Sequence, residues 1–395
     1  MTPIFLEPVH SFEMDVRILS NIHLQPQRIH IMLYKNVDEL QRFMEKCFIR
    51  LGVTEPDAEV CARILITSDL RGIESHGIGR LRMYVDRIHK GLIETNAPHE
   101  IVRESPTTAV VDGHHGIGMV IAHRSMSLAI EKARQFGMGA VAVRNSTHLG
   151  IDGYYPLMAV EAGMIGMSFT NARPAVAPTF SGQPKLGTNP IAFGAPTDEP
   201  FPFLYDAATS ITQRGKIEVL ARKENHPSNP AWVIGSEGQT LTDSQQILDL
   251  LVTDEAALLP LGGSLEDTGS HKGYCLSTIV EILSSALQTG AFLSGLSGLS
   301  ADGQETRFRV GHFFMAINIE NFLPLDEFKH NIGAILRELR AARKLPGADR
   351  IYTAGEKEYY TEREIRQKGI AINEGLKKDL LHVKNLLGIE DFELS

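Results

Sequence analysis

The chain has 395 residues, a formal net charge of −9 and three cysteines, which is long enough for two or three domains of ~100–200 residues each. The acidic balance and the lack of a long basic run argue against nucleic acid as the main partner, because phosphate backbones are bound by dense lysine and arginine. No stretch of ~18 apolar residues is present, so we expect no membrane span. Three scattered cysteines make neither a disulfide framework nor a CxxC metal site, and they fit a reducing, cytoplasmic location.

Residues 1–30 form an N-terminal extension that resembles no targeting signal. The segment carries Glu7, Glu13 and Asp15 and lacks a long apolar core, unlike a secretory signal or a mitochondrial presequence. We expect a loosely attached, disordered extension.

The next segment predicts a helical hairpin. Apolar residues recur at helical spacing over residues 37–51, from Leu40 to Leu51, and Gly52 ends the pattern. A second helix then starts after Thr54, has Pro56 in its first turn and continues toward Leu70.

From about residue 107 short β-rich runs alternate with helices, which is typical of an α/β or α+β domain. Strands are expected at residues 108–112, 139–144, 165–170, 191–195, 203–206 and 312–319, and helices at 121–136, 155–162 and 272–287. After residue 323 helices return, at 326–342, 358–368 and 373–387.

Two familiar nucleotide-binding motifs are missing. The chain has no GxGxxG fingerprint and no GxxxxGK[ST] loop. The nearest match, GMGAVA at residues 137–142, ends a helix and enters a strand, whereas the fingerprint must leave a strand and open a helix. We therefore interpret Gly137 as the C-cap of a helix.

The segment RGIESHGIGR at residues 71–80 is the first that suggests chemistry. His76 can exchange a proton near neutral pH, and Arg80 offers a planar fork for a carboxylate. Ser75 can hydrogen-bond a substrate oxygen. The alternative is a helix C-cap with a surface histidine.

Further polar segments follow expected strand ends or begin a helix. NSTHLG at 145–150 places His148 just beyond a strand, where ligand-facing residues of α/β sheets are found, although a capped turn is the alternative. In GSHKGY at 269–274, Ser270 is a candidate N-cap and Lys272 adds positive charge where a helix start already favours a dinucleotide phosphate.

Fifteen histidines raise the question of a metal site. His114 and His115 are the densest pair, but neighbours in a strand point apart and rarely share a metal. No HExxH is present. We expect no metal.

Taken together, these motifs resemble the malate/L-lactate dehydrogenase family of the non-Rossmann type, with its sulfolactate, ureidoglycolate and diketogulonate oxidoreductases and cyclic-imine reductases. The motifs are RGIESHGIGR, NSTHLG, KLGTNPIAF, DAATS followed by RGKI, HKGY, RVGHFFMAI and LPGADR. Each is weak alone, but their joint occurrence in this order, over about residues 33–390, is specific.

The resemblance implies NAD- or NADP-dependent interconversion of a small 2-hydroxy acid and its 2-oxo acid, and a homodimer. It also implies that His76 or His148 is the acid/base, that Arg80 binds the substrate carboxylate, and that Ser75 and Asn171 are further polar contacts. Arg307 or Arg309 is a candidate for a second carboxylate.

The resemblance also implies the residues that bind the cofactor. They are Thr188, Asn189, Asp206, Ala207, Ala208, Thr209, Ser210, His271, Lys272, Gly273, Ala354, Gly355 and Glu356. Asp206 has an alternative role, which is to orient His76 by accepting its second N–H. Cys275 stands where the family usually has glycine, and Arg173 stands where relatives vary.

The expected fold is α/β (α+β). A non-Rossmann dinucleotide-binding sheet domain spans 106–323, and a discontinuous helical domain is formed by 31–105 and 324–395, with the site between them. The alternative functions are a dinucleotide-binding relative without catalysis, a reductase of a cyclic imine or a ureidoglycolate-type substrate, and a metal-dependent hydrolase.

Overall fold

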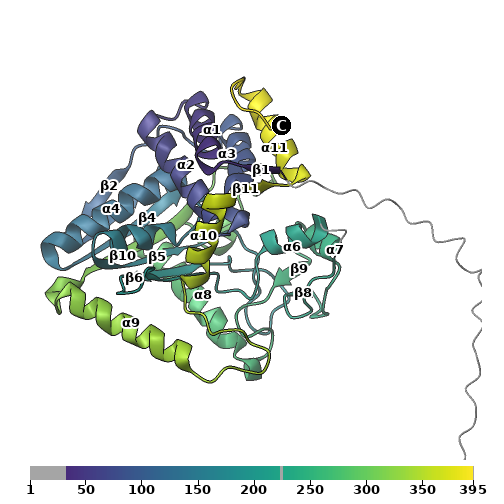
Figure 1. Cartoon of the computed structure of the whole chain (residues 1–395). Helices are drawn as coiled ribbons and strands as arrows, with labels where there is room; N and C mark the ends of the chain where they lie inside the picture. The colour runs from purple at the N-terminus through teal and green to yellow at the C-terminus, as the bar shows by residue number, and fades with distance from the viewer. Residues whose placement is uncertain (1–32, 223–225, 395) are drawn as a thin grey trace, which may run out of the picture.

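The computed structural model describes residues 33–222 and 226–394 (Figure 1). The predicted extension at residues 1–30 lies outside these ranges. Within them, no helix combines the length and the apolar character needed to cross a lipid bilayer.

A seven-stranded sheet forms the centre of the molecule, in the order β2-β3-β4-β10-β5-β6-β7. Its strands are β2 (Glu100–Glu104), β3 (Thr108–Asp112), β4 (Met138–Ser146), β5 (Met164–Thr170), β6 (Ile191–Ala195), β7 (Phe203–Ala207) and β10 (Val310–Asn318). Strands β3 and β4 run parallel, and the other neighbouring pairs run antiparallel. A Rossmann sheet is mostly parallel, so the predicted non-Rossmann fold class is confirmed.

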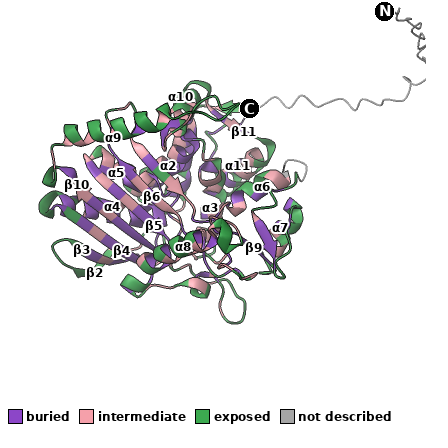
Figure 2. Ribbon diagram, turned by 90° about the horizontal axis from the view of Figure 1, so that it is seen from below, coloured by how far each residue is buried: buried purple, intermediate pink, exposed green. Residues whose placement is uncertain are grey.

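Helices cover both faces of this sheet (Figures 1 and 2). Helices α4 (Gly118–Phe136) and α5 (Tyr154–Glu161) pack on one face, and α8 (Ser270–Ser284) packs on the other. Because side chains alternate along a strand, Val141 and Phe314 belong to the core under α4, whereas Ala142 and Phe313 pack toward Val280 of α8.

The first and last segments of the described chain pack together, as predicted. Helices α1 (Val37–Arg50), α2 (Glu55–Leu70) and α3 (Leu81–His89) lie beside α11 (Glu374–Leu386) (Figure 1). Strand β1 (Leu33–Lys35) pairs antiparallel with β11 (Ile370–Ile372), and the rings of Phe43 and Phe392 stack with their centroids 3.8 Å apart. The two ends of the described chain therefore lie together, and their apolar residues share one core with α4 and the sheet.

Two more C-terminal helices complete the described chain. Helix α9 (Leu325–Ala341) runs along the outside of the molecule, and α10 (Glu356–Lys368) contacts α2 (Figure 1). Gly137 is the left-handed C-cap of α4, with φ 88°, as predicted. The N-cap of α8 is Gly269 and not Ser270. Ser270 is the first helical residue, and its hydroxyl group lies 2.9 Å from that of Thr179.

A small lobe between β7 and α8 was not predicted. It contains α6 (Arg214–Arg222), β8 (Val233–Gly235), α7 (Ser244–Leu250) and β9 (Ala256–Leu258), with a separate apolar cluster around Ile217, Val233 and Leu258. Strands of three residues are too short to produce a readable alternation. Strand β2 pairs with β3, so the sheet begins at Glu100, before the expected boundary at residue 106.

The start of α4 packs unusually close to the turn that carries His148. The backbone N–H of Gly118 donates to the hydroxyl group of Thr147 at 2.9 Å. A Cβ at Gly118 would lie 2.2 Å from the carbonyl oxygen of Thr147 and 2.5 Å from that of His148. Backbone atoms inside a packed core have little room to move, so glycine is required here.

We predict that Gly118→Ala lowers the free energy of unfolding by about 1–3 kcal/mol, because the added methyl group overpacks this contact. Urea unfolding of both proteins measures the change. Gly79→Ala is the control, since a Cβ there would have its nearest neighbour at 3.6 Å. Equal stability of the two variants would contradict the prediction.

Candidate active site

The loop after α2 carries His76 and is anchored by a buried carboxyl group. Oδ2 of Asp69 accepts a hydrogen bond from the backbone N–H of Ile78 at 2.7 Å, and burial raises the pKa of Asp69 to about 8. A Cβ at Gly77 would lie 1.9 Å from Oδ1 of Asp69. The missing side chain at Gly77 therefore lets the loop fold back onto α2.

Two hydrogen bonds in series orient the ring of His76. Its Nδ1 lies 2.8 Å from Oγ of Ser75, and the amide group of Gln213 donates to the same hydroxyl group at 3.2 Å. Because a hydroxyl group can donate and accept, Ser75 can form a hydrogen bond with Nδ1 in either neutral tautomer of the imidazole. Nε2 of His76 has no hydrogen-bond partner in the described part of the chain and is left for a ligand.

His148 comes from the turn after β4 and faces His76. The two rings stack with their centroids 5.5 Å apart and their planes 19° from parallel. Nδ1 of His148 lies 2.6 Å from the hydroxyl group of Tyr84 and accepts the backbone N–H of Gly150 at 3.2 Å. Since an N–H can only donate, Nδ1 of His148 is the acceptor, and the neutral ring carries its proton on Nε2.

Both imidazoles are neutral near pH 7. Burial, reinforced by the charge of Arg80, lowers the pKa of His76 to about 4. Burial also holds the pKa of His148 well below its usual value, with contributions from His76, Arg80 and Arg87. Nε of Arg80 donates to the backbone carbonyl of Ser75 at 2.6 Å. A guanidinium group therefore lies near two uncharged rings, and an anion bound there would make them easier to protonate.

The side chain of Asp206 contacts the start of α5, and no hydrogen bond joins it to His76 among the described residues. Its Oδ2 accepts the backbone N–H of Gly153 at 2.7 Å, and burial raises its pKa to about 6. The buried Asp152 accepts a hydrogen bond from Ser168, while its Oδ2 has no partner among the described residues. Burial, together with the charge of Asp206, raises the pKa of Asp152 well above its usual value. The charge of the half-buried Asp206 therefore disfavours ionisation of Asp152.

The start of α8 fits an anionic group of a cofactor. A Cβ at Gly273 would lie 2.2 Å from the carbonyl oxygen of Leu261, so the helix starts tightly against the preceding loop. Nδ1 of His271 is buried and has no hydrogen-bond partner within the described ranges, and Lys272 is exposed. Free N–H groups at a helix start favour negative charge, and a buried imidazole nitrogen needs a partner.

The predicted DAATS segment is tied to the turn before β6. Thr209 donates to the carbonyl oxygen of Thr188 from its N–H at 2.9 Å and from its hydroxyl group at 3.1 Å. The hydroxyl group of Ser210 donates to a backbone carbonyl two residues later. Ala207 and Ala208 are half-buried. Backbone contacts therefore hold this stretch in place.

Two predicted site residues have side chains that the fold itself uses. Oδ1 of Asn171 accepts the N–H of Gly311 at 2.8 Å. The amide group of Asn189 donates to Glu281 at 2.9 Å, and Oδ1 of Asn189 accepts a backbone N–H at 3.2 Å. Both asparagines are buried, so their polar atoms join the ends of β5 and β10 and the turn before β6 to α8.

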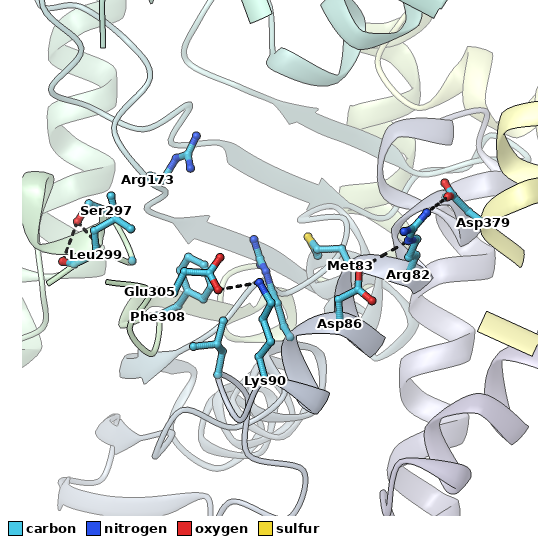
Figure 3. A pocket seen from close by; sticks show the side chains of 14 residues that line it. Arg82, Met83, Asp86, Lys90, Arg173, Ser297, Leu299, Glu305, Phe308 and Asp379 are labelled. Atoms are coloured by element: carbon cyan, nitrogen blue, oxygen red, sulfur yellow. Dashed lines mark hydrogen bonds and ion pairs between the residues drawn. The ribbon is translucent and has the colours of Figure 1, made fainter. Parts of the chain in front are cut away.

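A cavity of about 430 Å³ opens between α3 and the loop before β10 (Figure 3). Gly79, next to Arg80, lies in its wall. Arg307 and Arg309 are exposed and are not among the residues that line this cavity. Arg307 instead donates to the carbonyl oxygen of Gly91 at 3.1 Å.

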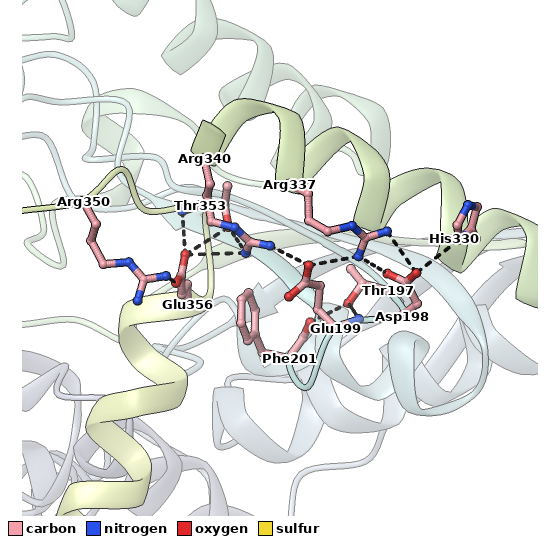
Figure 4. A network of polar contacts seen from close by, with 10 residues as sticks. All are labelled: Thr197, Asp198, Glu199, Phe201, His330, Arg337, Arg340, Arg350, Thr353 and Glu356. Atoms are coloured by element: carbon pink, nitrogen blue, oxygen red, sulfur yellow. Dashed lines mark hydrogen bonds and ion pairs between the residues drawn. The ribbon is translucent and has the colours of Figure 1, made fainter. Parts of the chain in front are cut away.

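Glu356, predicted to contact the cofactor, is buried in a network of ion pairs (Figure 4). It pairs with Arg350 and lies 3.7 Å from Arg340 of α9. The neighbouring Ala354 and Gly355 lie against the backbone of β7. The carboxylate of Glu356 thus joins α9 to α10.

The histidine pair considered for a metal makes other contacts. Nε2 of His114 lies 2.6 Å from Glu100, and Nδ1 of His115 lies 2.8 Å from the carbonyl oxygen of Phe308. Across the described ranges, no group of three or more His, Cys, Asp or Glu side chains is arranged to hold a metal ion.

Sequence reasoning missed Tyr84, Arg87 and Gln213. Tyr84 and Arg87 follow Arg80 by four and seven residues on α3, so a helical spacing from Arg80 would have found them on the same face. Gln213 lies in an irregular segment, where no periodic pattern identifies its position.

Comparison with known proteins gives a consistent result. A family model described as malate/L-lactate dehydrogenase matches residues 36–381. A malate dehydrogenase of Pyrococcus abyssi is 45% identical over 358 residues, which are 90% of this chain and 96% of that protein. A malate/(S)-sulfolactate dehydrogenase of Methanothermus fervidus is 34% identical over 353 residues, 89% of this chain and 98% of that protein.

Solved structures agree. The crystal structure of malate dehydrogenase from Entamoeba histolytica matches with a TM-score of 0.88 at 44% identity, and covers 91% of this chain and 99% of that one. Because the family model spans most of the chain and the relatives match over nearly their full length, the chain belongs to the malate/L-lactate dehydrogenase family.

Proposed function

We propose that this chain is a dehydrogenase that interconverts a small 2-hydroxy acid of the malate type and its 2-oxo acid, with NAD as the cofactor. The observation that carries the proposal is the pair of neutral imidazoles beside Arg80. Membership of a dehydrogenase family implies a nicotinamide cofactor. NAD is supported by a relative, the ureidoglycolate dehydrogenase (NAD(+)) of Escherichia coli, which is 28% identical.

His76 is the proposed acid/base. Its Nε2 is left for the substrate oxygen, while Ser75 holds its Nδ1 at 2.8 Å. In the oxidising direction the neutral ring takes the hydroxyl proton of the substrate, and in the reducing direction the protonated ring returns it. The hydroxyl group of Ser75 accepts the Nδ1–H of the protonated ring and limits its rotation.

His148 is proposed to act as a neutral hydrogen-bond donor. Its Nδ1 accepts a backbone N–H, so gaining a proton there would break a hydrogen bond. The Nε2–H of the neutral ring then polarises the substrate oxygen, as a fixed donor does in an oxyanion hole. Arg80 binds the substrate carboxylate through its terminal nitrogens.

The cofactor is proposed to lie along the start of α8 and the DAATS segment. A bound nicotinamide accepts or supplies the hydride. Lys272, the unpartnered nitrogen of His271 and the backbone at Gly273 would hold its phosphate groups, and Asp206 would contact its polar groups.

A homodimer is also proposed, and α8 supports it. The buried side of α8 carries small residues such as Gly273 and Ser277, whereas Leu276, Ile279 and Ile282 are 39%, 48% and 53% exposed. An apolar outer face on a helix favours burial against a second copy. A reducing, cytoplasmic location is proposed because all three cysteines are unpaired.

We predict that the purified protein oxidises NADH with oxaloacetate or a related 2-oxo acid, and that His76→Ala lowers kcat by ~10²–10⁴-fold through loss of the proton donor. Initial rates with NADH and NADPH measure this. His330→Ala, on the exposed side of α9, is the control and keeps wild-type turnover. Full activity of both His76→Ala and His148→Ala would overturn the mechanism.

The depressed pKa of His76, about 4, predicts different pH profiles for the two directions. Oxidation of the 2-hydroxy acid needs the neutral ring, which predominates above pH 5, so kcat/KM for oxidation stays constant between about pH 5 and 8. Reduction needs the scarce protonated ring, so its kcat/KM falls ~tenfold per unit rise in pH over that range. A pKa near the ordinary histidine value in the oxidation profile would contradict this assignment.

We predict that Ile279→Glu and Ile282→Glu convert the dimer to a monomer, because each places a charge in the proposed contact. Sedimentation equilibrium measures the mass. Leu386→Glu, on the exposed side of α11, leaves the dimer intact. A wild-type chain that sediments as a monomer would remove the proposal.

A further inference from the structure

The cavity beside α3 holds more positive than negative groups close to the proposed acid/base site. Arg82, Arg87, Lys90 and Arg173 line it, together with three carboxylates (Figure 3). The cavity reaches the loop of Arg80 through Gly79. Because Gly79 directly precedes Arg80 in the chain, the cavity lies next to the proposed carboxylate-binding residue.

The carboxylates in the cavity wall are already paired. Glu305 lies 2.7 Å from Lys90. Asp379 and Asp86 lie 2.7 Å and 3.7 Å from Arg82. Each carboxylate in the cavity wall therefore forms an ion pair with a cation other than Arg87 or Arg173.

Arg87 has no ion-pair partner among the described residues, and it is fixed in place. Its guanidinium group lies over the ring of Phe308, 4.2 Å from the centroid. This stacking holds the flat face of the group and leaves its N–H edge for an acceptor. Arg87 is half-buried, and burial together with the charges of Arg80 and Arg173 lowers its pKa.

Arg173 approaches the same cavity from the segment after β5. It also lacks an ion-pair partner within 4 Å in the described ranges, and burial and the charge of Arg214 lower its pKa. Asp254 and Glu305 offset part of the positive charge at Arg173 and Arg87 respectively, but neither forms an ion pair with these arginines. Guanidinium groups that lie near one another repel, and a bound anion removes that cost. Planar forks bind carboxylate or sulfonate oxygens in pairs.

We propose that Arg87 and Arg173 form a subsite for a second acidic group of the substrate, and so select dianionic 2-oxo acids over monoanionic ones. The inference rests on the proposed dehydrogenase function and specifies the substrate class of the same site. The proposed subsite uses Arg87 and Arg173, whereas the sequence suggested Arg307 and Arg309 for the second acidic group. Arg307 and Arg309 flank Phe308 in the chain, and both are exposed.

The test compares kcat/KM for oxaloacetate and for pyruvate in Arg87→Gln and Arg173→Gln. We expect the oxaloacetate-to-pyruvate ratio to fall by ~10–100-fold in each, as expected for loss of a hydrogen bond to a charged group. Arg82→Gln is the matched control, because Arg82 lines the same cavity but is paired with Asp86 and Asp379. Its ratio stays at the wild-type value.

An unchanged ratio in the folded Arg87→Gln and Arg173→Gln proteins overturns the subsite. So does an equal fall in the Arg82→Gln control. If Arg87→Gln fails to fold after losing its contact with Phe308, Arg173→Gln still decides the question. A wild-type protein that reduces neither oxaloacetate nor pyruvate defeats the proposed function itself, which is a different outcome.

Discussion

The contact between the start of α4 and the backbone of Thr147 and His148 is the constraint on which the site depends. With no side chain at Gly118, these backbones approach closely enough to fix the turn after β4. The loop after α2 is fixed separately, by Asp69 beneath Gly77. The two histidines therefore meet as parts of two rigid segments, and little freedom is lost when a substrate binds.

Electrostatics follow from this packing. Bringing two imidazoles together, away from water and beside Arg80, disfavours a proton on either ring. Their hydrogen bonds divide the roles. The hydroxyl group of Ser75 can accept a hydrogen bond from a protonated Nδ1 of His76. A proton on Nδ1 of His148 would instead break the hydrogen bond that this atom accepts from the backbone N–H of Gly150. Similar burial thus produces one ring that can gain a proton and one that stays neutral.

The fold and much of the site could be predicted from the sequence, because long helices and buried strands leave periodic patterns and the family motifs keep their order. Individual contacts could not. The side chains of Asn171 and Glu356 resemble binding groups in sequence, yet they join parts of the fold. Tyr84 and Arg87 carry no motif. They become visible once α3 starts beside Arg80, because a helical turn then brings them to the same side.

The formal charge of −9 is no obstacle to binding a small anion, because salt screens exposed charges beyond ~8 Å. A substrate in the cavity therefore responds mainly to the charges that line it. Four cations and three carboxylates surround that space, and the carboxylates are matched to Arg82 and Lys90. Arg87 and Arg173 are the two lining cations without an ion pair among the described residues, so a small anion can respond to these unpaired charges more than to the net charge of the whole chain.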